Sequence, residues 1–155
     1  MTRTLTISEE ITMDHVVYVD AKAGELQKIL DGSKTMIIRG ATGRKMPYGR
    51  VDEGDILYFI ENKGDGLIKA KAEVKSVFNS EKLSEDESKN LVEENQAKLN
   101  LTNPQIKRWA GKRYLVLIEI TNVNEITPFS IDKSNYGNMD DWLPVGDIDD
   151  IKVSD

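Results

Sequence analysis

The stretch Gly32-Ser33-Lys34-Thr35-Met36-Ile37-Ile38-Arg39 decides the fold that we expect for this chain. It follows a segment with helical spacing over 21–30. Asp31 and Gly32 end that segment, because glycine readily takes the left-handed conformation of a helix cap. The apolar run over 35–39 then predicts a strand. A helix, a tight turn and a strand are therefore expected with almost no loop between them.

Cationic side chains stand at both ends of this predicted strand. Because side chains alternate between the two faces of a strand, Lys34 is expected on the face of Met36 and Ile38. Arg39 is expected on the opposite face with Ile37. The two cations converge only if the strand bends or carries a bulge. Their presence in an acidic chain predicts an anionic ligand.

Charge is distributed unevenly along the chain. The sequence has 155 residues, with 21 Lys and Arg against 27 Asp and Glu, and a formal net charge of −6. The segments 33–50 and 105–113 contain cations and no acidic residue, whereas 130–155 holds seven aspartates and two lysines. This segregation favours a local anion site on an acidic protein. The alternative is that the basic stretches simply face solvent.

Composition sets the expected compartment and domain number. The chain has no cysteine, which excludes disulfides and thiolate metal sites and fits a reducing environment, so a cytoplasmic location is expected. The opening residues 1–5 lack an apolar signal region, and no apolar run approaches the roughly 20 residues that span a bilayer. No membrane partner is therefore expected. The length suits one domain over 1–155, with an irregular Asp-rich tail from about residue 132.

The elements expected along the chain indicate a mainly β fold of the α+β class. Residues 67–77 alternate between apolar and polar side chains, which predicts a strand with one wet face. Ser84-Glu85-Asp86-Glu87 is a capping box that starts a helix to about Asn100, and Asn103-Pro104 starts another. Further strands are expected over 15–19, 55–60, 114–121 and 125–131. Most connections are too tight for parallel crossovers, so we expect a small mixed or antiparallel β-barrel with helices at its openings.

This pattern resembles the ASCH branch of the PUA-like superfamily. The resemblance rests on a helix entering Gly-x-Lys-x-x-Glu-x-Arg, then a basic loop, then a Val/Leu-x-x-Gly-Asp strand start. Gly32, Lys34 and Arg39 match the first motif, and Val51-Asp52-Glu53-Gly54-Asp55 matches the second. The order of elements supports the resemblance over 16–131. It implies that residues 1–155 form a single PUA-like, ASCH-type domain.

The resemblance also implies a function. ASCH domains are implicated in RNA binding and RNA metabolism, and one branch resembles acetylcytidine amidohydrolases, so a protein that binds RNA or a modified nucleotide is implied. The family glutamate falls on Ile37 here, as does the threonine of those hydrolases, which place a lysine at the position of Lys34. Isoleucine neither transfers a proton nor attacks a substrate. We therefore expect binding rather than catalysis, with Lys34 central if the protein is an enzyme.

The candidate ligand residues lie in the two basic segments. Lys34 is expected to contact an anion, or to have a lowered pKa if it is buried. Arg39 is expected to bind a phosphate or carboxylate through bidentate hydrogen bonds, and a structural ion pair is the alternative. Tyr48 and Trp109 are candidates to stack on a base, although packing is the stronger expectation for Trp109. The full set is Lys34, Arg39, Arg44, Lys45, Tyr48, Arg50, Lys107, Arg108, Trp109, Lys112 and Arg113.

No cofactor or metal is expected. His15 is the single histidine and belongs to no nucleophile motif, so a structural role at a strand end is expected. The pairs Asp140-Asp141 and Asp149-Asp150 match no calcium loop. Two alternatives to RNA binding remain. One is a small hydrolase acting on an acylated nucleoside or RNA, and the other is a noncatalytic protein-interaction domain that uses the acidic tail.

Overall fold

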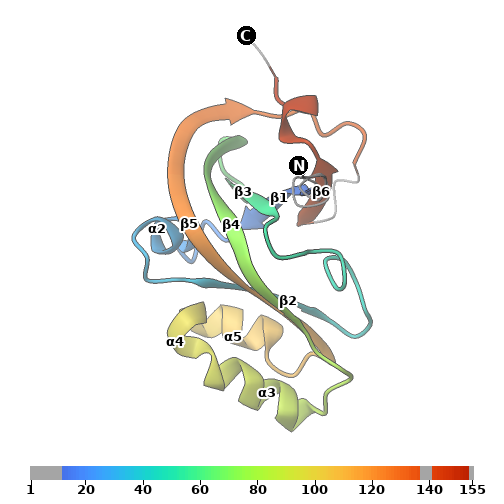
Figure 1. Ribbon diagram of the computed structural model, residues 1–155. Coiled ribbons are helices and arrows are strands. Elements are labelled where there is room, and N and C mark those ends of the chain that lie inside the picture. Colours follow the sequence, from blue (N-terminus) through green and yellow to red (C-terminus); the bar gives the residue numbers. More distant parts are fainter. Residues whose placement is uncertain (1–11, 137–140, 154–155) are drawn as a thin grey trace, which may run out of the picture.

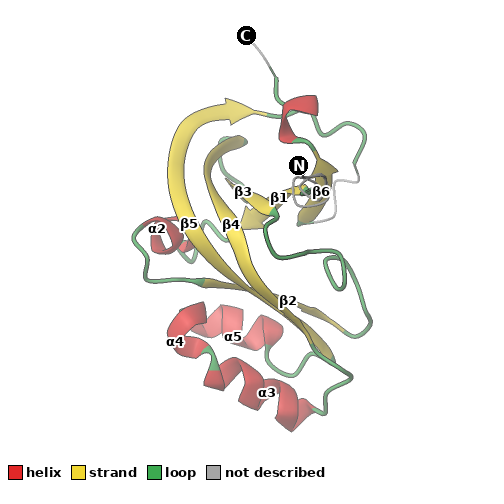
Figure 2. Ribbon diagram, viewed as in Figure 1, coloured by secondary structure: helices red, strands yellow, loops and turns green. Residues whose placement is uncertain are grey.

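A curled, mixed β-sheet forms the body of the molecule, as Figures 1 and 2 show. The computed structural model describes residues 12–136 and 141–153, so the opening residues 1–5 lie outside the described residues. Within the described part, the strands are hydrogen-bonded in the order β2-β5-β4-β3-β1-β6. Their bounds are β1 (Asp14–Val19), β2 (Met36–Ala41), β3 (Ile56–Glu61), β4 (Leu67–Asn79), β5 (Tyr114–Ser130) and β6 (Trp142–Gly146). The expectation of a mainly β, mixed, barrel-like fold is confirmed, and the sheet is a half-barrel.

One strand pair is parallel, whereas the tight connections predicted mostly antiparallel pairs. β1 runs parallel to β3 and antiparallel to β6. The chain between β1 and β3 contains α2 (Glu25–Leu30) and β2, which together supply the long crossover that a parallel pair requires. All other strand pairs are antiparallel in the part of the chain described.

Three helices gather at one end of the sheet, beside β2 and away from β6 (Figure 1). They are α3 (Glu85–Glu94), α4 (Gln96–Leu99) and α5 (Asn103–Trp109), and a short 3₁₀ turn, η1 (Ile148–Asp150), lies in the C-terminal tail. The capping box of α3 is confirmed, because the Ser84 hydroxyl accepts a bond from the Glu87 amide at 3.1 Å. None of the described helices is both long and apolar enough to cross a membrane.

The expected helix over 84–100 is wrong as one continuous element. It breaks at Asn95, whose backbone leaves helical geometry and whose side-chain amide donates to the Leu91 carbonyl at 2.9 Å. Asparagine competes for backbone hydrogen bonds in this way, which explains the break. The start of α5 is also shifted, because Thr102 rather than Asn103 caps the helix.

The two late strands expected over 114–121 and 125–131 are in fact one strand, β5. Asn122 has a positive φ of 51°, and the register between β4 and β5 shifts at this point, but pairing continues beyond it. The tail is not wholly irregular either. Trp142 and Leu143 are buried, and they belong to β6, which pairs with β1.

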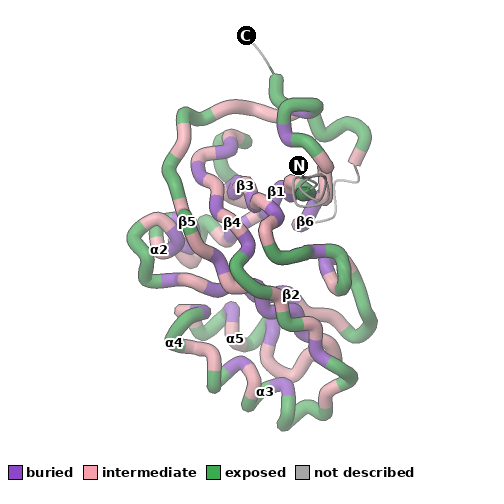
Figure 3. Tube along the Cα trace, in the orientation of Figure 1, coloured by how far each residue is buried: buried purple, intermediate pink, exposed green. Residues whose placement is uncertain are grey.

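The alternation along β2 divides the core into layers. Ile37 faces the inside of the half-barrel, where it packs in one cluster with Phe59 and Ile118. Met36 and Ile38 face the other way, into the cluster under α3–α5. In Figure 3 the residues of these helices are mostly exposed or intermediate, whereas many residues of the strands are buried. The expected alternation is confirmed, and it places Arg39 on the inner face, two residues before the end of β2.

Candidate functional site

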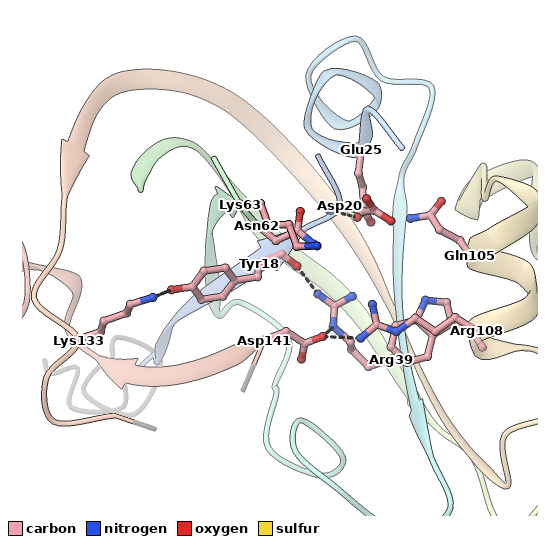
Figure 4. Close-up of a pocket in the computed structure, with 11 residues that line it drawn as sticks. Tyr18, Asp20, Glu25, Arg39, Asn62, Lys63, Gln105, Arg108, Lys133 and Asp141 are labelled. Atoms are coloured by element: carbon pink, nitrogen blue, oxygen red, sulfur yellow. Dashed lines mark hydrogen bonds and ion pairs between the residues drawn. The ribbon is translucent and has the colours of Figure 1, made fainter. Parts of the chain in front are cut away.

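Two hollows lie next to each other where β1, β2 and α5 approach. The first hollow has a volume of about 280 Å³ and the second about 400 Å³. The first is shown in Figure 4 and is lined by Tyr18, Asp20, Glu25, Asn62, Lys63, Gln105 and Lys133. The second is lined by Gly40, Ala41, Thr42, Lys45, Met46 and Lys112. Both are also lined by Arg39, Arg108, Trp109 and Asp141, which we call the arginine junction.

Arg39 reaches across the opening of the half-barrel. One terminal nitrogen donates to the Tyr18 carbonyl of β1 at 2.6 Å, and the other donates to the carbonyl of Ile38 at 2.8 Å. Its side chain is 8% exposed. A buried guanidinium needs a counter-charge and several acceptors, because desolvation otherwise outweighs its contacts. The structural ion pair considered for Arg39 is therefore present, and the residue also lines both hollows.

The Nε atom of Arg39 is not fully satisfied. It lies 3.2 Å from an Asp141 carboxylate oxygen, which makes an ion pair. The same Nε is buried and has no hydrogen-bond partner among the described residues. The two observations agree if the carboxylate lies off the N–H direction, since a hydrogen bond weakens steeply below about 120°. One buried donor at the junction thus remains free for a better-placed acceptor.

Arg108 completes the junction from α5. Its guanidinium lies 4.4 Å from the centre of the Trp109 ring, while that of Arg39 lies 5.8 Å from the same ring. Arg108 also lies 3.5 Å from the Asp141 oxygen that pairs with Arg39. Trp109 itself is 7% exposed and packs in the cluster under the helices. Packing, the stronger expectation for Trp109, is confirmed, and one carboxylate faces two guanidinium groups.

Lys34 lies behind the first hollow and lines neither hollow. It is 1% exposed, its ammonium donates to the Leu99 carbonyl, and it lies 3.4 Å from a Glu25 carboxylate oxygen. Lys28 similarly donates to the Asn100 carbonyl at 3.0 Å, so two cations meet the carbonyl end of α4, where positive charge is favourable. Burial lowers the pKa of Lys34, and the Glu25 carboxylate opposes this effect.

The two cations of the opening motif do not converge. β2 pairs with β5 without a register shift, so the bulge that would bring Lys34 and Arg39 together is missing. Lys34 points to Glu25 and α4, whereas Arg39 points to β1 and Asp141. Glu25 lies between them, because its carboxylate contacts Lys34 and lines the same hollow as Arg39.

The remaining candidates separate into three groups. Lys45 and Lys112, one from each basic segment, line the second hollow together. Arg44 lies 5.7 Å from the Tyr48 ring and 5.6 Å from the Tyr114 ring, which places it in an aromatic cluster beside that hollow. The Tyr48 hydroxyl donates to the Ser80 carbonyl and anchors the loop. The third group is Arg50, Lys107 and Arg113, which are exposed and, like Arg44 and Tyr48, line neither hollow.

Comparison with known proteins gives a match in structure and none in sequence. No family model matches the chain, and no curated protein is similar to it in sequence. The solved structure of the ASCH protein from Zymomonas mobilis matches with a TM-score of 0.64 at 12% identity, covering 85% of this chain and 87% of that chain. Two single-substitution variants of that protein match with the same TM-score and identity.

The chain has the fold of an ASCH domain. At this identity the likeness shows the fold alone, which is PUA-like, as the motif in 32–39 implied. The ASCH-type fold also explains Asp55 in the second motif. Its carboxylate accepts the Asp52 amide at 2.9 Å and the Met13 amide at 3.0 Å, so it holds the turn before β3 against the start of β1.

Ile37, which takes the position of the glutamate in the motif that this stretch resembles, is completely buried in the inner cluster. A carboxylate reaches Lys34 from α2 instead. Glu25 is 5% exposed, and its second oxygen accepts the Asp20 amide at 2.7 Å. Sequence reasoning missed Glu25, because a glutamate in the first turn of a helix is usually a solvated residue that favours the helix dipole.

Two amide side chains were also missed. Gln105 accepts the Thr102 amide through its carbonyl oxygen at 3.0 Å, and Asn62 accepts the Ala21 amide at 2.9 Å. The amino groups of both side chains are left for the first hollow, which they line, and the Gln105 side chain points toward Glu25 in Figure 4. The capping box of α5 was the available sequence signal for Gln105, but only packing shows where its amino group lies.

His15 has a structural role inside β1. The indole N–H of Trp142 donates to His15 Nδ1 at 3.0 Å. His15 Nε2 therefore carries the hydrogen and donates to Asp55 at 2.9 Å. Within residues 12–136 and 141–153, no group of three or more His, Asp or Glu side chains is arranged to hold a metal ion, and Asp140 of the predicted aspartate pair lies outside these ranges.

Proposed function

We propose that this protein binds single-stranded RNA or a nucleotide in the two hollows, with a phosphate group at the arginine junction. The observation that carries the proposal is the convergence of Arg39 and Arg108 beside Trp109, where a buried Nε lacks an acceptor. Guanidinium groups bind phosphate oxygens through short, charge-assisted hydrogen bonds. The ASCH-type fold supports the same class of ligand by analogy.

The surroundings of the junction support a small anionic ligand. Lys45 and Lys112 extend positive charge along the second hollow. Tyr48 is partly exposed next to Arg44, which suits stacking on a base at the far end of the loop. The whole chain nevertheless has a net charge of −6, which disfavours binding to a long duplex through its phosphates. A short, single-stranded ligand agrees with both facts.

A salt titration with a matched pair of variants tests this function. Fluorescence anisotropy of a labelled single-stranded RNA would be measured with Arg108→Gln and with Arg113→Gln, which remove the same charge from exposed positions five residues apart. We expect Arg108→Gln to weaken binding about tenfold and to reduce the salt slope by about 0.7, the value for one phosphate contact on a single strand. Arg113→Gln should leave both quantities nearly unchanged.

Two results would count against RNA binding. The first is no measurable binding by the wild-type protein even at low salt. The second is an equal loss in the two variants, which would mean that the protein's overall charge rather than the junction attracts the RNA.

A second candidate function, hydrolysis of an acylated nucleoside or RNA, has one observation in its favour. Glu25 lines the first hollow while it contacts the buried Lys34, so a carboxylate whose charge is balanced by a lysine faces the space for a substrate. A carboxylate beside a substrate can act as a general base. Turnover of N-acylated nucleosides by the wild-type protein, lost in Glu25→Gln while RNA affinity is retained, would support this function. No turnover of these substrates would eliminate it.

A further inference from the structure

We propose that the ligand is a strand of at least two nucleotides, whose bridging phosphodiester takes the place of the Asp141 carboxylate at the arginine junction. This inference rests on the proposed function and specifies the ligand class of the same site. It concerns Asp141, which sequence reasoning considered only as a possible cation ligand.

The shape of the site indicates a ligand with two parts. The two hollows have different linings except at the junction, where they share Arg39, Arg108, Trp109 and Asp141. At about 280 Å³ the first hollow is at the small end of the range of about 300–1,000 Å³ for small-molecule sites. A ligand that fills both hollows must therefore have two bulky parts joined by a narrow link. That link lies beside two guanidinium groups, so it is expected to be anionic.

Asp141 contacts both arginines of the junction. One of its oxygens lies 3.2 Å from Arg39 Nε and 3.5 Å from an Arg108 terminal nitrogen. Among the described residues lining the second hollow, Asp141 is the single acidic side chain. Its carboxylate thus occupies the position of an anion between two cations, but it does not satisfy the buried Nε of Arg39. The two non-bridging oxygens of a phosphodiester share one negative charge, and each of them can accept hydrogen bonds from one arginine.

The Asp141 carboxylate can leave the arginine junction without opening the fold. The Asp141 backbone carbonyl accepts the Tyr18 amide at 3.0 Å, directly before β6. The side chain is 37% exposed, so rotation about its own bonds takes it into solvent while the backbone stays paired. The Asp141 carboxylate therefore balances the charge of the buried Arg39 until the phosphate of a ligand displaces it.

The two hollows also differ in chemistry in the way two nucleotides require. The first hollow presents the amino groups of Asn62 and Gln105 beside the Glu25 carboxylate, a mixture of donors and acceptors that suits the edge of a base. The second presents Lys45 and Lys112, which suit the next phosphate along the strand.

A neutral-linkage probe tests the inference on the wild-type protein. Calorimetric titration would compare a dinucleotide with a normal phosphodiester, the same dinucleotide with an uncharged methylphosphonate link, and a mononucleotide. We expect the uncharged link to weaken binding about tenfold, because it removes charge-assisted hydrogen bonds to two arginines. The mononucleotide, which leaves one hollow empty, should also bind about tenfold more weakly than the charged dinucleotide.

Asp141→Asn supplies the second test, with Asp52→Asn as its matched control. Asp52 is exposed and lines neither hollow, so its substitution makes the same change in net charge away from the site. We expect Asp141→Asn to strengthen binding of the charged dinucleotide about threefold to tenfold and to leave the neutral one unchanged. Asp52→Asn should change neither affinity by more than about twofold.

The outcomes separate this inference from the function on which it rests. Equal affinities for the charged and neutral dinucleotides would overturn the inference, as would equal effects of Asp141→Asn and Asp52→Asn. If longer RNA still bound through Arg108 in that case, the proposed function would stand alone. If the wild-type protein bound none of these ligands and no longer RNA, both proposals would fail. The neutral-linkage comparison decides the matter even if Asp141→Asn does not fold.

Discussion

Lys34 and Glu25 form an ion pair that is almost completely removed from water. Their side chains are 0% and 7% exposed, and each has a further partner in the backbone, the Leu99 carbonyl and the Asp20 amide. A pair of this kind adds little stability over a well-packed apolar pair, but removing one member leaves a buried charge without compensation. The motif lysine is therefore best understood first as a residue that fixes α2 and α4 behind the site.

Replacing Lys34 alone should be much more harmful than replacing the pair. We expect Lys34→Met to lower the free energy of unfolding by about 3 kcal/mol or more, because Glu25 then remains buried and unpaired. The double variant Glu25→Gln with Lys34→Met should lose less than the single one. Urea denaturation measures both. A double variant that is as unstable as the sum of two single variants would contradict the ion pair.

The same lysine predicts a dependence of stability on pH. Burial lowers the pKa of Lys34 in the folded state below its ordinary value of 10.5. Between the lowered pKa and 10.5 the unfolded chain therefore binds more protons than the folded protein, and stability rises with pH in this window. The contribution is complete above 10.5 and is lost as the pH falls through the folded-state pKa.

Unfolding at several pH values up to 10.5 checks this sign, because the slope is expected immediately below 10.5. The wild-type free energy of unfolding should rise with pH relative to that of the Glu25→Gln, Lys34→Met double variant, in which neither group titrates. Subtracting the variant removes the contribution of the other lysines and tyrosines. A difference that stays flat or falls with pH would show that the folded-state pKa of Lys34 is not lowered.

At the scale of elements, β6 depends on one polar contact as well as on its pairing. It is a short edge strand that pairs only with β1 among the described strands. Trp142, its first residue, is 1% exposed and donates to His15, which in turn bonds to Asp55. This chain of hydrogen bonds joins β6 to β1 and to the turn before β3. It also fixes the position of Asp141, which immediately precedes β6.

Trp142→Phe should loosen this element selectively. The change leaves His15 Nδ1 buried without a donor, which costs about 1–3 kcal/mol. We expect hydrogen exchange to accelerate most in β6 and in the facing residues of β1, and least in β4 and β5. Mass spectrometry of the exchanged protein would show the pattern. Equal acceleration in all strands would indicate a general loss of stability rather than a local anchor.

At the scale of the whole molecule, Arg39 helps to close the half-barrel. β2 and β6 stand at opposite ends of the strand order, and no backbone ladder joins them in the described residues. The Arg39 side chain spans the opening instead, to the Tyr18 carbonyl on β1 and to Asp141 beside β6. It also lies 5.5 Å from the Trp142 ring. The Arg39 side chain therefore joins the two ends of the sheet, as hydrogen bonds between the first and last strands do in a closed barrel.

The two arginines of the junction should accordingly differ in their effects on stability. Arg39→Gln is expected to lower the free energy of unfolding by about 3 kcal/mol, since it breaks a buried set of charged contacts. Arg108→Gln should change it by less than about 1 kcal/mol, because that side chain is 58% exposed. Chemical denaturation of both variants measures this. Similar losses would mean that Arg39 does not hold the opening together.

The site was only partly accessible to sequence reasoning. Lys45, Lys112, Arg39 and Arg108 were all candidates, and the structure brings them to one pair of hollows. Glu25 and the two amide side chains were missed, because each has an ordinary local role as a helix or turn residue. Asp141 was considered only for metal binding, since nothing in its neighbours along the chain shows that it lies between two arginines.

The sequence by itself determined the local structure of this protein. The alternation in 35–39 and in 67–77, and the capping box at Ser84, each depend on contacts between near neighbours, and each was confirmed. The PUA-like fold followed from their order. The tertiary structure alone decided the continuation of β5 past Asn122, the pairing of β6 and the partners of Lys34 and Arg39. The physical reason is that these outcomes depend on charges and hydrogen-bonding groups from distant segments, which meet only when the sheet curls.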